Sequence, residues 1–240
     1  MEKETKTKNK RKLTALAKDF REKILDYAVN AHIENNAKWH LPLCVLYATG
    51  CRPVELVKGV SVKYNDEDKT LRFVIKGAKI NDKLQRGIAL RTVKIKVVDE
   101  NNEFLNWSKP LIEEIQKQNV DHIEVKTTSA NAFSGYIHKA SKKLWPRRSE
   151  HVSAYSFRHA VAKSLKDSGA DPVKIASVLG HASTRSQLSY GRKSRKGGGD
   201  VSPEVEVTTS STIRDNKDQH VDKLLRFKIK SRNKLKFGKR

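Results

Sequence analysis

Cysteine is scarce in this chain, which has only Cys44 and Cys51 among its 240 residues. The two thiols lie seven positions apart, and no Cys or His cluster stands near them at the spacing of metal ligands. The sequence therefore excludes a disulfide framework and a Cys-rich zinc site. We expect both cysteines to be reduced residues of the core, as in a cytosolic protein, and we expect no bound metal.

Long hydrophobic runs are also missing. The uncharged apolar stretch 41–51 has only eleven residues and contains Pro42, which is about half of what a bilayer-spanning helix requires. The first thirteen residues are polar and basic, without the apolar run and cleavage site of a secretory signal. These absences predict a cytoplasmic protein without a membrane partner.

Acidic residues are the minority: 27 Asp and Glu stand against 50 Lys and Arg, which gives a net charge of +23 and a pI near 10.0. Such an excess attracts polyanions, above all nucleic acid. Residues 1–12 carry +4, residues 221–240 carry +8, and the residues between them carry +11. With 37% hydrophobic residues and three Trp, the chain is too apolar to be a disordered basic tail.

Hydrophobic periodicity predicts an α+β fold that is mainly α-helical with a small antiparallel β-sheet. Apolar residues recur at three- and four-residue steps from Leu13 to Ala31, and a second helix is expected to end at Gly50. In residues 71–76 and 93–97, apolar residues instead recur at every second position. We interpret these segments as strands separated by the basic connection 77–86. Helical periods return in residues 103–118, 128–145, 153–167, 172–179 and 183–195.

Composition divides the chain into a basic N-terminal arm, 1–12, a body, 13–196, and a C-terminal region, 197–240. The C-terminal region opens with three consecutive glycines and stays poor in large apolar residues until about His220, which is typical of a linker. In residues 221–240, Leu, Ile and Phe alternate with basic residues. We expect this basic tail either to bind the phosphates of a nucleic acid backbone or to dock onto a protein.

Three short segments carry residues suited to phosphate chemistry. The predicted helix 153–167 places Tyr155 and Arg158 three positions apart on one face, away from the side that Phe157 shares with the apolar stripe. Arg52 lies between a helix-ending glycine and a helix-starting proline, and the segment Leu179-Gly180-His181 precedes Tyr190 by nine residues.

Each of these residues alone is more often structural than functional, but the combination is chemically specific. Two arginines suit bidentate binding of phosphate oxygens, and a tyrosine hydroxyl is a covalent nucleophile. Together they describe phosphoryl transfer on a polyanion without a metal.

The set resembles the catalytic domain of the tyrosine recombinases, the phage integrase family. The segment TGCRPVEL around Arg52 matches the first-arginine motif of that family, SFRH around Arg158 matches the second, and LGH ending at His181 matches the third. Tyr190 stands where the family has its nucleophile, and Lys76, followed by a glycine, fits its sheet lysine. The resemblance covers about residues 13–195 and implies the catalytic fold shared with type IB topoisomerases.

The resemblance also implies a mechanism. The hydroxyl of Tyr190 would attack a DNA backbone phosphate, giving a 3′-phosphotyrosyl link, while Arg52 and Arg158 bind the non-bridging oxygens. His181 would add a hydrogen bond there, and Lys76 would be the general acid for the leaving 5′ oxygen. No ATP, metal or other cofactor is implied. DNA-binding residues are expected at Lys79, Lys83, Arg86 and Arg185.

The implied partner is double-stranded DNA, bound by a homotetramer in which C-terminal segments are exchanged between subunits. An accessory protein or a second recombinase is a further implied partner. In a bacterium, the resemblance places such a protein in the cytoplasm with the nucleoid.

Two features depart from the family pattern. Tyr155 occupies the position where the family usually has His, and a phenol with an ordinary pKa of about 10 donates a hydrogen bond to phosphate but is a poor base at neutral pH. In addition, only twelve residues, six of them Lys or Arg, precede the catalytic region, where most members have a helical domain that clamps the DNA.

Other classes of protein remain as alternatives. A helix-turn-helix over residues 173–190 fits at Ala176 and Gly180, but it places the polar His181, Ser186 and Ser189 where the motif requires apolar residues. A weak or inactive recombinase retained for DNA binding is a better form of that hypothesis. A type IB topoisomerase would use the same tyrosine chemistry as a monomer.

Overall fold

The computed structural model describes residues 16–78, 80, 87–189 and 204–215. Within these ranges a helical part packs against one five-stranded antiparallel sheet, so the predicted fold class is confirmed. The α-helices are α1 Phe20–Asn35, α2 His40–Thr49, α3 Pro53–Lys58, α4 Lys109–Gln118, α5 Ala130–Leu144, α6 Ala154–Asp167 and α7 Pro172–Val178. The strands are β1 Val60–Asn65, β2 Thr70–Lys76, β3 Leu90–Lys96, β4 Ile123–Val125 and β5 Val205–Thr209.

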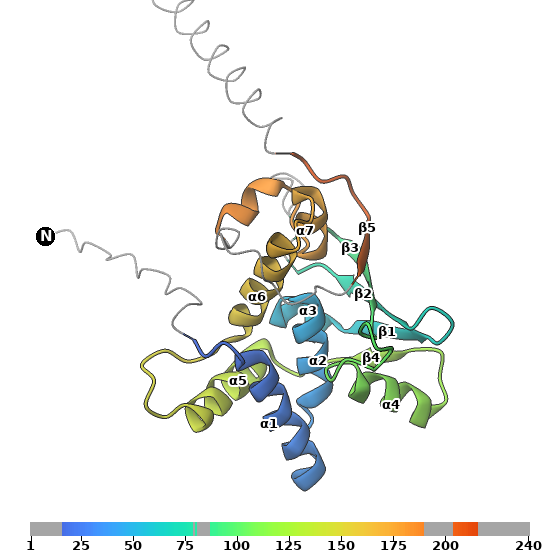
Figure 1. The fold of residues 1–240 in the computed structure, drawn as a ribbon. Coiled ribbons are helices and arrows are strands. Elements are labelled where there is room, and N and C mark those ends of the chain that lie inside the picture. Colours follow the sequence, from blue (N-terminus) through green and yellow to red (C-terminus); the bar gives the residue numbers. More distant parts are fainter. Residues whose placement is uncertain (1–15, 79, 81–86, 190–203, 216–240) are drawn as a thin grey trace, which may run out of the picture.

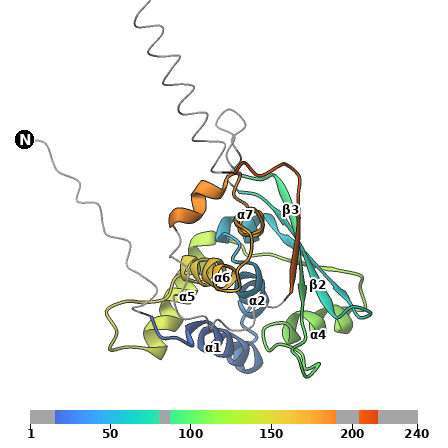
Figure 2. The same ribbon diagram turned by 45° about the horizontal axis from the view of Figure 1, so that its top comes forward.

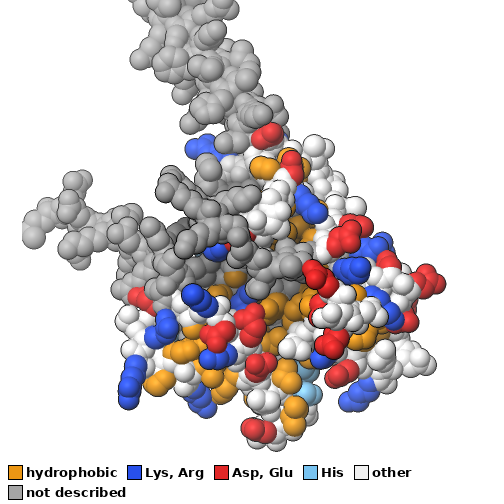
Figure 3. Space-filling view, in the orientation of Figure 1, with side chains coloured by type: hydrophobic (Ala, Val, Ile, Leu, Met, Phe, Trp, Pro, Cys, Tyr) orange, Lys and Arg blue, Asp and Glu red, His pale blue; other side chains and the backbone are white. Residues whose placement is uncertain are grey.

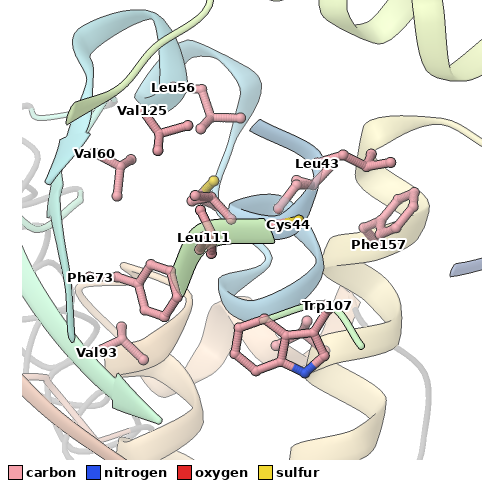
Figure 4. Packing of buried hydrophobic residues seen from close by; sticks show 14 of the residues in the cluster. Leu43, Cys44, Leu56, Val60, Phe73, Val93, Trp107, Leu111, Val125 and Phe157 are labelled. Carbon is pink, nitrogen blue, oxygen red and sulfur yellow. The ribbon is translucent and has the colours of Figure 1, made fainter. Parts of the chain in front are cut away.

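The sheet has the strand order β4-β1-β2-β3-β5, and it stands beside helices α2, α6 and α7 (Figures 1 and 2). Its central strands alternate buried and exposed side chains, as their period-two sequences predict. The buried side chains of β2 and β3 meet those of α2, α4 and α6 in one core (Figure 4). This core fixes the ends of α2, α6 and α7, which carry the predicted site.

Both cysteines belong to this core as free thiols, as expected. Burial raises the pKa of the Cys51 thiol to about 12, so it stays protonated and unreactive at neutral pH. Burial also raises the pKa of Cys44 far above its ordinary value. Among the described residues, none of the helices has the length and apolar character needed to cross a bilayer.

Local sequence signals explain the helix ends near the site. Gly50 ends α2 in the left-handed conformation, with φ 58°, as predicted. Pro53 and Pro172 occupy the first turns of α3 and α7, and the side chain of Asp171 caps α7 by accepting a hydrogen bond from the amide of Val173. These signals are local, which is why the sequence alone predicts them.

Three predicted helices differ from the structure. The first, expected from Leu13, begins at Phe20 within the described residues. The helix expected from residue 103 begins at Lys109, because Phe104 forms an antiparallel bridge with Val98 and the amide of Leu105 donates to the carbonyl of Val97 at 2.8 Å. The Asp99 carboxylate holds the turn between these two segments by accepting from the amides of Asn101 and Glu103 at 2.9 Å each. The helix expected over 183–195 is a 3-10 helix, η2 Thr184–Ser189, within the described residues. Strands β1 and β4 were not predicted.

The predicted linker 197–220 also contains structure. Strand β5 pairs with β3, with Val207 opposite Val93. Beyond it, Arg214 forms a bridge with Ser183, and Ile213 is buried. Val205 and Val207 alternate with polar residues, as in a strand. Two valines in an otherwise polar segment are too few to predict a strand from the sequence. The C-terminal region therefore adds the edge strand next to β3. Its residue Arg214 then pairs with the segment that follows His181.

Candidate active site

Arg158 is the centre of the candidate site. Its side chain is only 1% exposed. One terminal nitrogen donates to the carbonyl oxygen of Gly50 at 2.8 Å, and the other donates to the carbonyl of Leu179 and contacts Nε2 of His181 at 2.9 Å. One guanidinium thus joins all three predicted motifs across α2, α6 and α7. The expectation that Arg158 points away from the core is wrong, because the ends of α2 and α7 cover this part of α6.

Gly50 allows the close approach of α2 to α6. A side chain at this position would place its Cβ 3.2 Å from the Cα of Arg158 and 3.2 Å from the Cβ of Val161. The glycine also adopts a positive φ that other residues rarely accept. The first motif therefore needs glycine for both reasons, and the carbonyl of that glycine orients Arg158.

Arg52 is fixed at the beginning of α3 by Glu55. The Glu55 carboxylate accepts from the backbone amide of Arg52 at 2.8 Å and from its Nη1 at 2.9 Å. In return, the carbonyl of Arg52 accepts the Glu55 amide at 2.8 Å. The Arg52 side chain keeps 12% of its surface exposed, whereas Arg158 is 1% exposed, so Arg52 is the more accessible of the two arginines.

Glu55 and Arg91 are site residues to which the sequence assigned no role. Both are buried, and the Arg91 guanidinium donates to both Glu55 oxygens, at 2.8 and 3.3 Å. Burial alone would raise the pKa of Glu55, but Arg91 and Arg52 outweigh it and lower the pKa to about 2. The sequence holds one signal for Arg91: it is in phase with the inward residues Val93 and Ile95.

His181 is a neutral imidazole in this site. Burial and the nearby guanidinium groups of Arg158, Arg52 and Arg91 lower its pKa to about 3. Because a guanidinium only donates, the Nε2 of His181 accepts from Arg158, and the ring proton is assigned to Nδ1. The ring is therefore suited to donate a hydrogen bond through Nδ1 rather than to take up a proton.

This depressed pKa predicts a pH dependence of stability. The unfolded chain binds a proton at His181 below about pH 6.5 while the folded chain does not, so stability is complete above that pH and falls toward pH 3. Between pH 7 and pH 5 the loss at this residue is about 2 kcal/mol in the free energy of unfolding. Urea titrations at both pH values measure it.

The control for that measurement is His181→Gln, which retains every other histidine. We expect its unfolding free energy to change less than that of the wild type between the two pH values. An equal change in both proteins would contradict a depressed pKa at His181.

Lys76 lies at the C-terminal end of β2, as predicted, and its side chain is exposed. The next residue, Gly77, has no room for a side chain, since a Cβ there would lie 1.9 Å from the carbonyl oxygen of Ile88. The structure therefore places Lys76 at the end of the central strand of the sheet, where the basic connection to β3 begins.

The remaining predicted residues are divided between described and undescribed parts of the chain. Tyr155 lies in the first turn of α6 and is 50% exposed, and Arg185 is exposed on η2. Neither is part of the hydrogen-bonded cluster around Arg158. The other predicted residues lie outside the described residues: Lys79, Lys83, Arg86 and the nucleophile candidate Tyr190.

Charge is distributed unevenly between these parts. The described residues hold 27 basic and 21 acidic side chains, a net charge of +6 out of +23. Figure 3 shows blue and red side chains intermixed over the described part of one face. The described part thus has no uniformly basic face in this view, and most of the excess charge belongs to the segments that flank it or interrupt it.

The phage integrase family matches residues 13–196. Because this match covers more than half of the chain, the protein belongs to the phage integrase family of tyrosine recombinases. The sequence-based recognition of the family is thereby confirmed.

Individual relatives match parts of the chain. Tyrosine recombinase XerC of Rickettsia bellii (strain OSU 85-389) is 47% identical over 47 residues, which are 20% of this chain and 15% of XerC. The crystal structure of XerA recombinase resembles 76% of this chain with a TM-score of 0.50 and 18% identity. The XerH site-specific recombinase bound to its difH substrate covers 78% of this chain and 53% of XerH, with 18% identity and a TM-score of 0.46. The chain spans only 61% of XerA.

Proposed function

We propose that this protein is a site-specific DNA recombinase that cuts and rejoins strands through a covalent bond to Tyr190. The observation that carries the proposal is the buried Arg158 guanidinium, which holds Gly50, Leu179 and His181 around one point. Membership of the phage integrase family supports it independently. The expected substrate is duplex DNA, because a polyphosphate backbone matches both the arginine pair and the net charge of +23.

The proposed reaction is a transesterification. The Tyr190 oxygen attacks the scissile phosphorus, a Tyr190 O–P bond forms, and the bond from phosphorus to the 5′ oxygen breaks. The phenolic proton passes to water, and the leaving 5′ oxygen takes a proton from Lys76. Because the phosphotyrosyl ester retains the bond energy, a 5′-hydroxyl reseals the strand by the reverse steps without ATP or a metal.

Four side chains would stabilise the pentacoordinate phosphate. The buried Arg158 and the more exposed Arg52 bind the non-bridging oxygens, and the Nδ1–H of His181 donates a further hydrogen bond. Tyr155 donates from the first turn of α6. Because His181 is neutral, the cluster of Arg52, Glu55, Arg91, Arg158 and His181 has a net charge of +2, which suits a phosphodiester that gains one negative charge in the transition state.

Recombination further requires four active sites on two duplexes. We propose a homotetramer in which the basic tail, residues 221–240, contributes to subunit contact, and in which Lys79, Lys83, Arg86 and Arg185 bind the DNA backbone.

The test is covalent capture on nicked DNA. A tiled set of duplexes from both flanks of the coding gene, each nicked so that a short 5′-hydroxyl strand diffuses away, is incubated with the full chain in EDTA. Denaturing electrophoresis should show a protein–DNA band, and mass spectrometry of the digest should place the nucleotide on Tyr190. An adduct on another residue, or none on any duplex, would overturn the proposal. Supercoil relaxation without strand exchange would instead indicate a topoisomerase.

The proposed general acid has a specific signature. Lys76→Ala should slow cleavage by about 10²- to 10³-fold, because the 5′ oxygen then leaves without a proton. A substrate with sulfur in place of that bridging oxygen should restore most of the rate, since a thiolate leaves unprotonated. The matched control is Lys96→Ala, at the exposed end of the neighbouring strand β3, which should cleave both substrates normally. A Lys76→Ala defect of equal size on both substrates would contradict the assignment.

A further inference from the structure

Arg91 is an arginine in a position where a strand normally places an apolar side chain. It lies on β3 opposite Ile75 of β2, and its side chain is 1% exposed. Burying an ionised group in the core is costly unless it is paired and hydrogen-bonded. The groups that pair with the Arg91 guanidinium therefore indicate which parts of the fold this buried charge holds together.

Those contacts join two of the three motifs of the site. The two terminal nitrogens hold the Glu55 carboxylate at 2.8 and 3.3 Å, and Nε donates to the carbonyl of Val178 at 2.9 Å. Glu55 in turn fixes Arg52, and Val178 is the last residue of α7, three positions before His181. One guanidinium on the sheet thus sets the separation between Arg52 and the segment that carries His181.

Gly180 gives independent support for this arrangement. A Cβ at Gly180 would lie 2.6 Å from Nη1 and 3.0 Å from Cζ of Arg91, closer than side-chain atoms tolerate, and Gly180 has a φ of 65°. The glycine of the third motif thus leaves space for the Arg91 guanidinium. The turn before His181 and the side chain of Arg91 fit one another.

The charges around Glu55 give Arg91 an electrostatic role as well. The Glu55 carboxylate lies between Arg52 and Arg91, and with Arg52 alone it would form a neutral pair. Arg91 compensates the carboxylate, so that the three groups together keep one positive charge. Without Arg91, a buried carboxylate would face the phosphate that Arg52 is proposed to bind.

We infer that Arg91 is a positioning residue for DNA cleavage: by holding Glu55 and the end of α7, it directs the Arg52 guanidinium and its charge toward the scissile phosphate. The inference rests on the proposed function. Arg52 is proposed to stabilise the non-bridging oxygens in the transition state. Loss of Arg91 should therefore impair that stabilisation while leaving DNA binding largely intact.

The experiment compares Arg91→Lys with Arg72→Lys, an exposed arginine on the neighbouring strand β2. The substrate is the nicked duplex that gives the wild-type adduct, and the measurements are the single-turnover rate, the Kd for the same duplex and the thermal unfolding midpoint. Lysine keeps the charge but not the fork that binds both Glu55 oxygens. Arg91→Lys should cleave about 10- to 100-fold more slowly, as misplaced catalytic groups do, with Kd within about threefold of the wild type and Arg72→Lys normal on all three.

A second substrate separates positioning from general loss of structure. With a methylphosphonate at the scissile position, one non-bridging oxygen and its negative charge are absent, so that the contribution of Arg52 matters less. The ratio of wild-type to Arg91→Lys rates should then fall at least about fivefold. The double variant Glu55→Gln/Arg91→Met removes both buried charges, which costs less stability than removing one, and it should fold and show the same slow cleavage and the same partial rescue.

The outcomes are distinct. No adduct with the wild type would overturn the proposed function, and the role of Arg91 with it. A wild-type adduct together with an undiminished rate in Arg91→Lys, or with an equal defect on both substrates, would overturn the role of Arg91 alone.

Discussion

Tyr190→Phe is expected to abolish the covalent adduct, with a loss of about 10⁴-fold or more in the cleavage rate, as when an enzyme loses its nucleophile. The substitution removes one oxygen, the atom that is proposed to bond to phosphorus, and leaves the ring. DNA affinity should therefore stay within a few-fold of the wild type. Single-turnover cleavage of the nicked duplex and a binding titration on the same duplex measure the two effects.

The matched control is Tyr155→Phe, which removes the same atom from the other tyrosine of the proposed site. Tyr155 is 50% exposed in the first turn of α6, and its proposed role is one hydrogen bond. We expect a loss of about fivefold to tenfold, the value of one neutral hydrogen bond. If Tyr155→Phe lost the adduct and Tyr190→Phe retained it, the two roles would be reversed.

Arg158→Ala should affect stability and cleavage together. The substitution leaves the carbonyls of Gly50 and Leu179 without the donor that satisfies them and opens a space beside His181. We expect a loss of about 2–4 kcal/mol in the free energy of unfolding. Cleavage should slow by about 10²- to 10³-fold, since one donor to the phosphate oxygens is lost. Urea unfolding and single-turnover rates measure the two losses.

Two variants separate the causes of that loss. Arg158→Lys keeps the charge but cannot donate in the same fork to several acceptors, so its stability should lie between those of Arg158→Ala and the wild type while its cleavage remains slow. Lys139→Ala, at an exposed position of the neighbouring helix α5, should leave both unfolding and cleavage unchanged. An unaltered unfolding transition in Arg158→Ala would contradict the bridging role.

The parts of the site that the sequence predicts are those with local signals. Gly50 and Gly180 identify helix ends, just before Arg52 and His181. The order of the three motifs along the chain identifies the family. Arg158 was recognised as a site residue, but its burial was not, because burial depends on how the ends of α2 and α7 meet around α6.

Arg91 shows the limit of such reasoning. Its sequence neighbours form an ordinary alternating strand, and its partners Glu55 and Val178 are 36 and 87 positions away. Only the pairing of β3 in the sheet and the packing of α3 and α7 against it bring these groups together. For the same reason, β5 could not be recognised as a strand until its partner β3 was known.

Strand β5 has a practical consequence for any shorter version of this protein. The region that matches the family ends at residue 196, yet β5 covers the edge of β3, and Arg214 pairs with the backbone at Ala182 and Thr184. A chain ended at the family boundary would expose the hydrogen-bonding groups of β3, which invite association with other strands. The smallest unit that preserves these contacts therefore extends to Asp215. A shortened chain meant to isolate the catalytic region should retain all residues up to Asp215.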